Sequence, residues 1–193
     1  MDSLKVTGGI KLKGKIKISG AKNSALPLMA CSLLLSKGEL KLDSMPNLAD
    51  TRFMSILLSS LGMTSRIENN IAYISGEPKT HIAEYDIVRK MRASILVLGP
   101  LLTRYRIAKV SLPGGCSIGT RPIDLHIKAF EKMGANILLK DGYIEAKAPK
   151  KGLHGAEISF PKISVGATEN IIMAAALANG ITRIINAAKE PEI

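Results

Sequence analysis

A cysteine in a polar, glycine-rich stretch is the first residue of this sequence that suggests chemistry. Cys116 lies within the segment Pro113-Gly114-Gly115-Cys116-Ser117-Ile118-Gly119-Thr120-Arg121-Pro122. A nearby cation such as Arg121 favours the thiolate, and glycines let a loop approach a ligand closely. The segment therefore predicts that Cys116 is a nucleophile or a proton donor. The alternative is a small buried apolar residue, the commonest fate of a free cysteine.

Two basic residues stand where helices are expected to begin. Lys22 and Asn23 follow the turn Ser19-Gly20-Ala21, and Arg92 occupies the matching place in Met91-Arg92-Ala93-Ser94. The free N–H groups and the positive dipole end of a helix favour an anion, and a basic side chain adds charge there. These residues are therefore candidates for binding an anionic ligand. The alternatives are a solvated lysine beside a capping asparagine, and a surface arginine.

The residues after the glycine-rich segment offer a carboxylate and an imidazole. Asp124 begins the next expected helix, and His126 follows Cys116 by ten residues. That spacing alone establishes no catalytic dyad. Cys31 lies on an apolar helix between Ala30 and Ser32, and we interpret it as a core residue.

Self-similarity with a period of roughly 72 residues organises the elements that carry these groups. Leu61-Gly62 and Met133-Gly134 each end an expected helix at a glycine. A strand, a tight turn and a second strand follow in both copies, with the turns at Asn69-Asn70 and Asp141-Gly142. Both residue pairs tolerate the positive φ of a hairpin turn. The sequence therefore predicts two repeat-related β-hairpins.

A second repeated element is a helix of small and apolar residues followed by a strand. Each unit thus consists of a helix, a strand, a second helix and a pair of strands. The third unit breaks off at Ile193, before its second helix, so the periodicity predicts that the complete architecture includes further residues. Pro27 is expected in the first turn of its helix, and Pro100 is expected to kink its own. The helix and strand copies are expected at 21–36 with 39–45, 91–103 with 109–112, and 167–178 with 181–187.

Composition limits the class of protein. The 193 residues are 46% hydrophobic, which is enough for a buried core. The net charge is +11, but the lysines are dispersed and aromatic residues make up only 4%, so no nucleic-acid partner is expected. No apolar run approaches the roughly 20 residues that span a bilayer, so no membrane partner is expected. No secretory signal is recognised and two cysteines make no disulfide framework, which predicts a cytoplasmic protein.

With these motifs in place, the chain resembles the family of UDP-N-acetylglucosamine enolpyruvyl transferases (1-carboxyvinyltransferases). The resemblance covers essentially the whole chain, in order. The shikimate-pathway enolpyruvyl transferases are near relatives that lack the cysteine segment. The matching motifs are Gly20-Ala21-Lys22-Asn23, Met91-Arg92-Ala93-Ser94, Leu112-Pro113-Gly114-Gly115-Cys116, Gly119-x-Arg121-Pro122-x-Asp124-Leu125-His126, Ser164-Val165-Gly166-Ala167 and Asn186-Ala187-Ala188-x-Glu190-Pro191-Glu192.

The resemblance implies transfer of the enolpyruvyl group of phosphoenolpyruvate to the 3-hydroxyl of UDP-N-acetylglucosamine. Phosphate is released, no metal or other cofactor is needed, and the product is the first committed intermediate of peptidoglycan synthesis. Carried over by position, Cys116 would be the general acid, Lys22 and Asn23 would contact phosphoenolpyruvate, and Arg92 would lie at the substrate site. The UDP-sugar would be held by Arg121, Pro122, Ile123, Asp124, Leu125, Lys162, Ile163, Ser164 and Val165.

The resemblance also implies a fold, an α/β inside-out barrel built of repeated β-α-β-α-β-β units, present here in truncated form. Residues 1–21, with strands at 4–6 and 15–18, would pack on a second domain. Residues 22–193 would form the first domain, with its third repeat incomplete. The expected partner is the missing C-terminal domain of the same enzyme, which holds the carboxylate base, so this chain alone would be inactive. A shikimate-pathway relative and a non-catalytic UDP-sugar-binding product are the alternatives.

Overall fold

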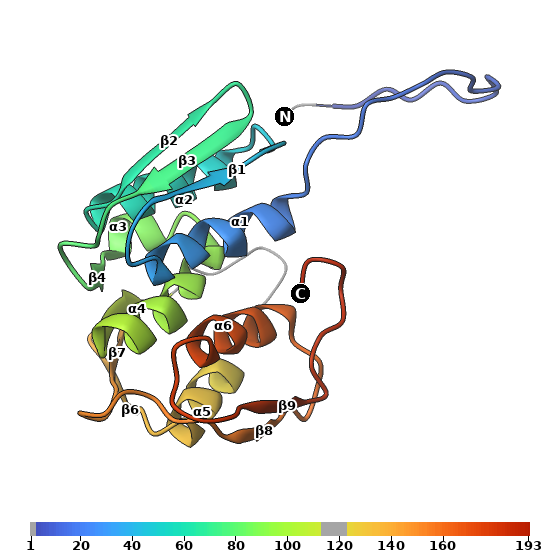
Figure 1. Cartoon of the computed structure of the whole chain (residues 1–193). Helices are drawn as coiled ribbons and strands as arrows, with labels where there is room; N and C mark the ends of the chain where they lie inside the picture. Colours follow the sequence, from blue (N-terminus) through green and yellow to red (C-terminus); the bar gives the residue numbers. More distant parts are fainter. Residues whose placement is uncertain (1–2, 113–122) are drawn as a thin grey trace.

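The computed structural model describes residues 3–112 and 123–193, which fold into repeated units of helices and strands (Figure 1). The first unit contains α1 (Lys22–Cys31), η1 (Ser32–Leu34), β1 (Glu39–Leu42), α2 (Ala49–Ser60), β2 (Thr64–Glu68) and β3 (Ile71–Ser75). The second contains β4 (Ile82–Ala83), α3 (Tyr85–Val88), η2 (Arg92–Val97), α4 (Leu98–Tyr105), β5 (Ile107–Ser111), α5 (Asp124–Lys132), β6 (Asn136–Lys140) and β7 (Tyr143–Lys147). The third contains β8 (Glu157–Ser159), α6 (Val165–Ala175) and β9 (Arg183–Ile185).

The strands form three separate sheets among the described residues. Their orders are β1-β3-β2, β4-β5-β7-β6 and β8-β9. β4 runs parallel to β5, and β8 runs parallel to β9, whereas the remaining pairs are antiparallel. The second unit therefore has the complete β-α-β-α-β-β order, once α3, η2 and α4 are counted together as one helical segment. The short first strands β4 and β8 were not located by the sequence patterns.

The two predicted hairpins, β2 with β3 and β6 with β7, are confirmed. The turn pair Asn69-Asn70 has φ of 50° and 60°, and Asp141-Gly142 has φ of 51° and 77°. Positive φ at both turn residues gives a backbone twist that matches the twist of the flanking strands. The helices before the hairpins end at Ser60 and Lys132, and each is followed as expected by a glycine with positive φ, 103° at Gly62 and 90° at Gly134.

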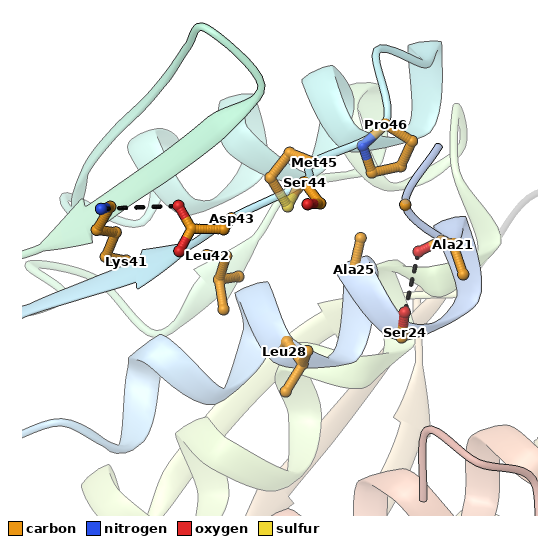
Figure 2. Close-up of a pocket in the computed structure, with 11 residues that line it drawn as sticks. Ala21, Ser24, Ala25, Leu28, Lys41, Leu42, Asp43, Ser44, Met45 and Pro46 are labelled. Carbon is orange, nitrogen blue, oxygen red and sulfur yellow. Dashed lines mark hydrogen bonds and ion pairs between the residues drawn. The ribbon is translucent and has the colours of Figure 1, made fainter. Parts of the chain in front are cut away.

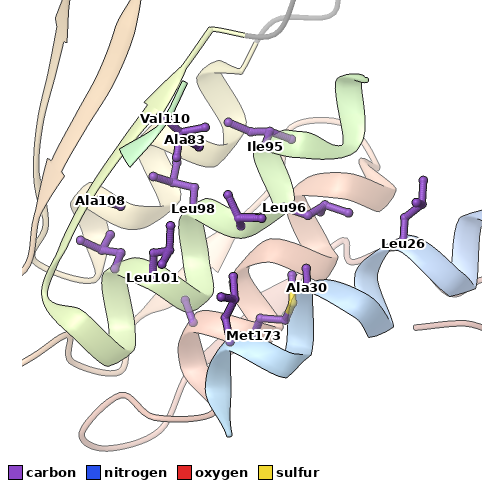
Figure 3. Packing of buried hydrophobic residues seen from close by; sticks show 14 of the residues in the cluster. Leu26, Ala30, Ala83, Ile95, Leu96, Leu98, Leu101, Ala108, Val110 and Met173 are labelled. Atoms are coloured by element: carbon purple, nitrogen blue, oxygen red, sulfur yellow. The ribbon is translucent and has the colours of Figure 1, made fainter. Parts of the chain in front are cut away.

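The helices form the interior and the sheets lie outside them, which confirms the inside-out arrangement (Figure 1). Leu96 of η2 and Leu101 of α4 are buried in one cluster with Met29 and Ala30 of α1 and Met173 of α6. Figure 3 shows this packing of helices from all three units. Burying each such leucine contributes about 1.5–3 kcal/mol to stability. Of the helices described, none is long and apolar enough to cross a membrane.

The helix expected over 91–103 is broken into a 3-10 helix, η2, and an α-helix, α4. Two causes meet at the break. Pro100 lacks an N–H group, so the carbonyl of Leu96 has no α-helical donor. The side chain of Asn170 also lies between the two backbone groups that would form the next α-helical bond, because it accepts from Gly99 N and donates to the Ile95 oxygen. The helix type therefore changes between Val97 and Leu98, before Pro100, and the expected kink at Pro100 stays a prediction.

Pro27 differs from its expectation, because it lies in the interior of α1 and not in its first turn. The other two helix copies are shorter than expected, since α1 and η1 end at Leu34 and α6 ends at Ala175. The strands that follow them are shorter as well, at 39–42 and 183–185. The pattern of small and apolar residues thus located these elements and misplaced their ends.

Residues 3–21 contain none of the strands expected at 4–6 and 15–18. The segment extends away from the body of the molecule (Figure 1). A β-strand needs a neighbouring strand to pair its backbone groups, and none of the described residues supplies one. Docking of this segment on a second domain stays a prediction. Its apolar side chains are 73–97% exposed, and they are Leu4, Val6, Ile10, Leu12, Ile16 and Ile18.

Candidate functional site

Lys22 is the first residue of α1 and forms an ion pair with a residue of α2. Its Nζ lies 2.9 Å from Oδ2 of Asp50, and the two side chains are 46% and 33% exposed. The N-cap, Ala21, contributes no side-chain hydrogen bond, and the neighbouring Asn23 is exposed. The first N–H groups of α1 therefore remain available to a ligand, next to an ammonium group whose place is fixed by Asp50.

Asp50 was missed by the sequence patterns. It lies in the first turn of α2, where an acidic residue is favoured by the helix dipole alone. The buried hydroxyl of Thr51 fixes this turn, because it lies 2.9 Å from both the Pro46 and the Leu48 carbonyl oxygens. The sequence does show an acidic residue in the first turn of a helix in the same unit as Lys22. That Asp50 pairs with Lys22, however, follows only from the packing of α1 on α2.

A cavity of about 300 Å³ opens beside the start of α1, between that helix and the segment that follows β1. Figure 2 shows Ala25 and Leu28 of α1 facing Leu42 and Met45 across it. The one ammonium group in its lining belongs to Lys41, which lies 3.7 Å from a carboxylate oxygen of Asp43. Because this ammonium group is already paired with a carboxylate, the cavity is a poor anion site. Lys22, which is expected from the sequence to bind an anion, begins the same helix next to the cavity.

Arg92 begins η2, the segment that matches α1 in the second unit, and its side chain is half-buried. The predicted equivalence with Lys22 therefore holds for the backbone. The two sites differ in their surroundings, because Arg92 forms no ion pair with any residue in the two described ranges. A guanidinium group at a helix start is available to an anion that arrives from outside.

The start of α5 carries three of the residues expected to hold a UDP-sugar. Ile123 precedes the helix, Asp124 is its first residue, and Leu125 is buried. Oδ1 of Asp124 is buried and has no hydrogen-bond partner among the described residues, while its Oδ2 lies 3.9 Å from Lys128 Nζ. The expected acid Cys116 and the expected ligands Arg121 and Pro122 lie outside the described residues.

The start of α6 carries the other expected UDP-sugar residues. Lys162 and Ile163 are exposed, and Val165 is the first residue of the helix. Ser164 caps it by accepting a hydrogen bond from Ala167 N at 3.3 Å. Lys162 and the α6 N-terminus therefore form a basic, solvent-accessible surface suited to a phosphate group.

His126, in the first turn of α5, contacts Asn170 in the middle of α6. Both side chains are buried, and Asn170 Nδ2 lies 3.1 Å from His126 Nδ1. On the other side of the imidazole, a Cβ placed on Gly166 would lie only 3.8 Å from Cε1. Burial lowers the pKa of His126 to about 4, although the nearby Asp124 carboxylate opposes this shift. The imidazole is therefore neutral at pH 7.

Glu169, next to Asn170 on α6, lies among the carboxylates of the last motif. The Ala188 N–H donates to Thr168 Oγ1 at 3.1 Å, which ties the segment 186–192 to α6. Burial, together with the nearby carboxylates of Glu192 and Glu190, raises the pKa of Glu169 to about 7. No group of three or more His, Cys, Asp or Glu side chains among the described residues could hold a metal ion.

Cys31 packs partly buried against the core, as the sequence predicted. Burial and the nearby Glu169 carboxylate raise the pKa of its thiol. Because the thiolate is the reactive form of cysteine, Cys31 is a poor nucleophile at neutral pH. Taken together, the described residues place basic side chains at or just before three helix starts, at Lys22, Arg92 and Lys162.

Comparison with known proteins identifies relatives of this chain. A family model described as EPSP synthase (3-phosphoshikimate 1-carboxyvinyltransferase) matches residues 6–193. The chain is 57% identical over 195 aligned residues to proteins named UDP-N-acetylglucosamine 1-carboxyvinyltransferase from Helicobacter pylori strain 26695 and from Campylobacter hominis. These alignments cover 100% of this chain and 46% of each relative, so the chain spans about half their length.

Solved structures support the same fold. The enolpyruvyl transferase NikO from Streptomyces tendae superposes with a TM-score of 0.75 at 17% identity, covering 96% of this chain and 43% of that one. EPSP synthase from Acinetobacter baumannii superposes with a TM-score of 0.73 at 17% identity, covering 93% and 42% of the two chains. At this level of identity the likeness concerns the fold alone, and it agrees with the inside-out arrangement of helices and sheets.

Proposed function

Because the chain belongs to the EPSP synthase family, we propose that its natural gene product transfers the enolpyruvyl group of phosphoenolpyruvate to the 3-hydroxyl of UDP-N-acetylglucosamine. The observation that carries this proposal is the 57% identity, over the whole chain, to proteins named for that activity. The family model's own name points to 3-phosphoshikimate as the alternative acceptor. The relatives at 57% identity favour the sugar nucleotide, and with it the first committed step of peptidoglycan synthesis.

Phosphoenolpyruvate is proposed to bind at the start of α1. Lys22 and Asn23 would contact it, with Lys22 oriented by the ion pair to Asp50 at 2.9 Å. The exposed side of this pair leaves the ammonium group accessible, and the α1 N-terminus adds free N–H groups. Arg92, at the matching start of η2, would complete the positive charge around the two anionic substrates.

The sugar nucleotide is proposed to bind where α5 and α6 begin. Its ligands would be residues 121–125, before and in the first turn of α5, and residues 162–165, before and in the first turn of α6. The buried contact between His126 and Asn170 supports this grouping, because it joins the first turn of α5 to the middle of α6, and Gly166 at the start of α6 lies beside the same imidazole. No cofactor enters the proposed reaction.

Cys116 is proposed to be the general acid. Its thiol would give a proton to the methylene carbon of phosphoenolpyruvate while the sugar 3-hydroxyl adds to the neighbouring carbon and loses its own proton. Loss of a proton from the new methyl group and of phosphate from the adjacent carbon then gives the enol ether. The base that accepts the hydroxyl proton is proposed to lie in the C-terminal domain, which would be the partner of this chain. A free thiol in this role requires a reducing compartment, which favours the cytoplasm.

The test is phosphate release by the natural gene product. We expect release from phosphoenolpyruvate when UDP-N-acetylglucosamine is supplied, and a loss of about 10²–10⁴ in kcat for Cys116→Ala, the usual contribution of a general acid. Cys31→Ala is the matched control and should keep its activity. Release with 3-phosphoshikimate in place of the sugar nucleotide would contradict the proposal. The 193-residue chain alone should show no turnover, whereas UDP-sugar binding without turnover by the natural gene product would favour the alternative of a non-catalytic binding protein.

Alkylation separates the two cysteines independently of turnover. The epoxide antibiotic fosfomycin should react with the sulfur of Cys116, opening the epoxide ring to a thioether and an alcohol. Cys31 should remain free, because burial raises the pKa of its thiol and so lowers the thiolate fraction. Mass spectrometry of a digest locates the adduct, and an adduct on Cys31 would contradict the proposed role of Cys116.

A further inference from the structure

Asn170 uses the whole of its carboxamide to join four segments from two repeat units. The side chain is fully buried. Its Oδ1 accepts from Gly99 N at 2.8 Å, and its Nδ2 lies 3.0 Å from the Ile95 oxygen and 3.1 Å from His126 Nδ1. Both amide hydrogens are therefore used, one toward η2 and one toward α5.

These contacts fix which atom is oxygen and which is nitrogen. The Gly99 backbone can only donate and the Ile95 carbonyl can only accept, so the carboxamide has one possible orientation. Nδ2 carries no lone pair for a donor, so His126 Nδ1 must be the acceptor. The neutral imidazole then carries its proton on Nε2, on the side of the ring away from Asn170.

Three of these four segments, η2, α5 and α6, begin at or just after proposed substrate residues. η2 begins at Arg92, α5 begins at Asp124, and Asn170 itself lies on α6, which Ser164 caps. We propose that Asn170 is a positioning residue for the sugar-nucleotide site, because it holds these three helix starts in register and holds His126 as the Nε2–H tautomer. This inference rests on the proposed function for the identity of the ligand.

The first test needs no variant and no substrate. Side-chain nitrogen NMR of the histidine-labelled natural gene product, with His126 assigned by comparison with His126→Gln, should show a proton on Nε2 and none on Nδ1 at pH 7. A proton on Nδ1 would overturn the inference. This result is independent of catalysis, so it stands even if the proposed function fails.

The second test separates positioning from general stability. Asn170→Asp keeps the size of the side chain and the acceptor for Gly99, but loses both donated hydrogen bonds. We expect the KM for UDP-N-acetylglucosamine to rise about tenfold and the KM for phosphoenolpyruvate to change by less than about twofold. The matched control is Thr103→Val, which removes the buried bond from Thr103 Oγ1 to the Ala174 oxygen between α4 and α6. That variant should lose stability and keep both KM values.

The outcomes distinguish the two claims. An active wild-type enzyme with unchanged KM values in Asn170→Asp, or with equal rises for both substrates, would overturn the role of Asn170. A wild-type gene product that is inactive with UDP-N-acetylglucosamine would instead contradict the proposed function. If Asn170→Asp fails to fold, the wild-type tautomer still decides the inference.

Discussion

Two regions of the molecule hold their polar groups in opposite ways. One is the start of α1, and the other is the junction, where Asn170 of α6 contacts Ile95 of η2, Gly99 of α4 and His126 of α5. At α1, one exposed ion pair joins Lys22 to Asp50, and water reaches both side chains. At the junction, the buried carboxamide of Asn170 makes three hydrogen bonds, one of them to a neutral imidazole. An exposed charge can exchange water for an anionic ligand, whereas a buried network fixes directions. The first region is therefore suited to binding, and the second to alignment.

The largest expected effect comes from the junction, at Gly99. A Cβ at this position would overlap both the backbone oxygen and Oδ1 of Asn170. We expect Gly99→Ala to lower the free energy of unfolding by about 3 kcal/mol or more, because the backbone of α6 would have to move. Urea unfolding of the natural gene product measures this.

Gly166→Ala is the matched control on the facing helix. Its new Cβ would lie 3.8 Å from the His126 ring, an ordinary contact distance, and would favour the helix. Its stability should remain within about 1 kcal/mol of the wild type. Equal stability of the two variants would show that the junction tolerates movement, and would remove the contrast with the start of α1.

The next largest effect is on how stability depends on pH, because two buried groups of α5 and α6, His126 and Glu169, act in opposite directions. The folded-state pKa of His126 is lowered to about 4, so its contribution to stability is present above pH 6.5 and is lost as the pH falls toward 4. The folded-state pKa of Glu169 is raised to about 7, so its contribution is present below pH 4.5 and is lost as the pH rises toward 7. Each contribution is at most about 3 kcal/mol.

The two slopes oppose each other in the wild type, and single variants should separate them. Glu169→Gln should lose stability as the pH falls from 6.5 to 4, whereas His126→Gln should gain stability as the pH falls from 7 to 4.5. Unfolding midpoints across this range measure both slopes. Identical pH profiles for the two variants would contradict the buried, shifted state of these groups.

The smallest expected effect on stability belongs to the exposed pair. Asp50→Asn should change the free energy of unfolding by less than about 1 kcal/mol, because a solvent-exposed ion pair contributes little. Thermal unfolding measures this, and Asp43→Asn, which removes a longer exposed contact to Lys41, is the matched control. A loss as large as that of Gly99→Ala would mean that the α1 start is part of the structural frame.

The repeat made much of the fold predictable from the sequence. Glycine caps and hairpin turns are local, so Gly62, Gly134 and the turn pairs Asn69-Asn70 and Asp141-Gly142 could be assigned from residue types alone. The inside-out arrangement came from the family resemblance. The strands expected before Lys22 did not form, because local alternation supplies no pairing partner.

Features that depend on distant residues escaped prediction. The break between η2 and α4 involves Asn170, which lies 71 residues beyond Gly99 in the chain. The pairing of Asp50 with Lys22 likewise requires α1 to pack against α2. The sequence identified Lys22 and Arg92 as related helix starts, but whether each had a carboxylate partner was decided by packing. The roles of the site residues stay proposals.

Phosphoenolpyruvate is thus assigned to the start of α1 and UDP-N-acetylglucosamine to the junction. Steady-state kinetics of the natural gene product test this assignment most directly. Steady-state phosphate release would be measured with each substrate varied in turn, for Asp50→Asn and for Asn170→Asp. We predict that Asp50→Asn raises the KM for phosphoenolpyruvate several-fold and that Asn170→Asp raises the KM for UDP-N-acetylglucosamine about tenfold, each with little effect on the other substrate. If both variants raise the KM for the same substrate, or if either variant raises both KM values equally, this assignment is wrong.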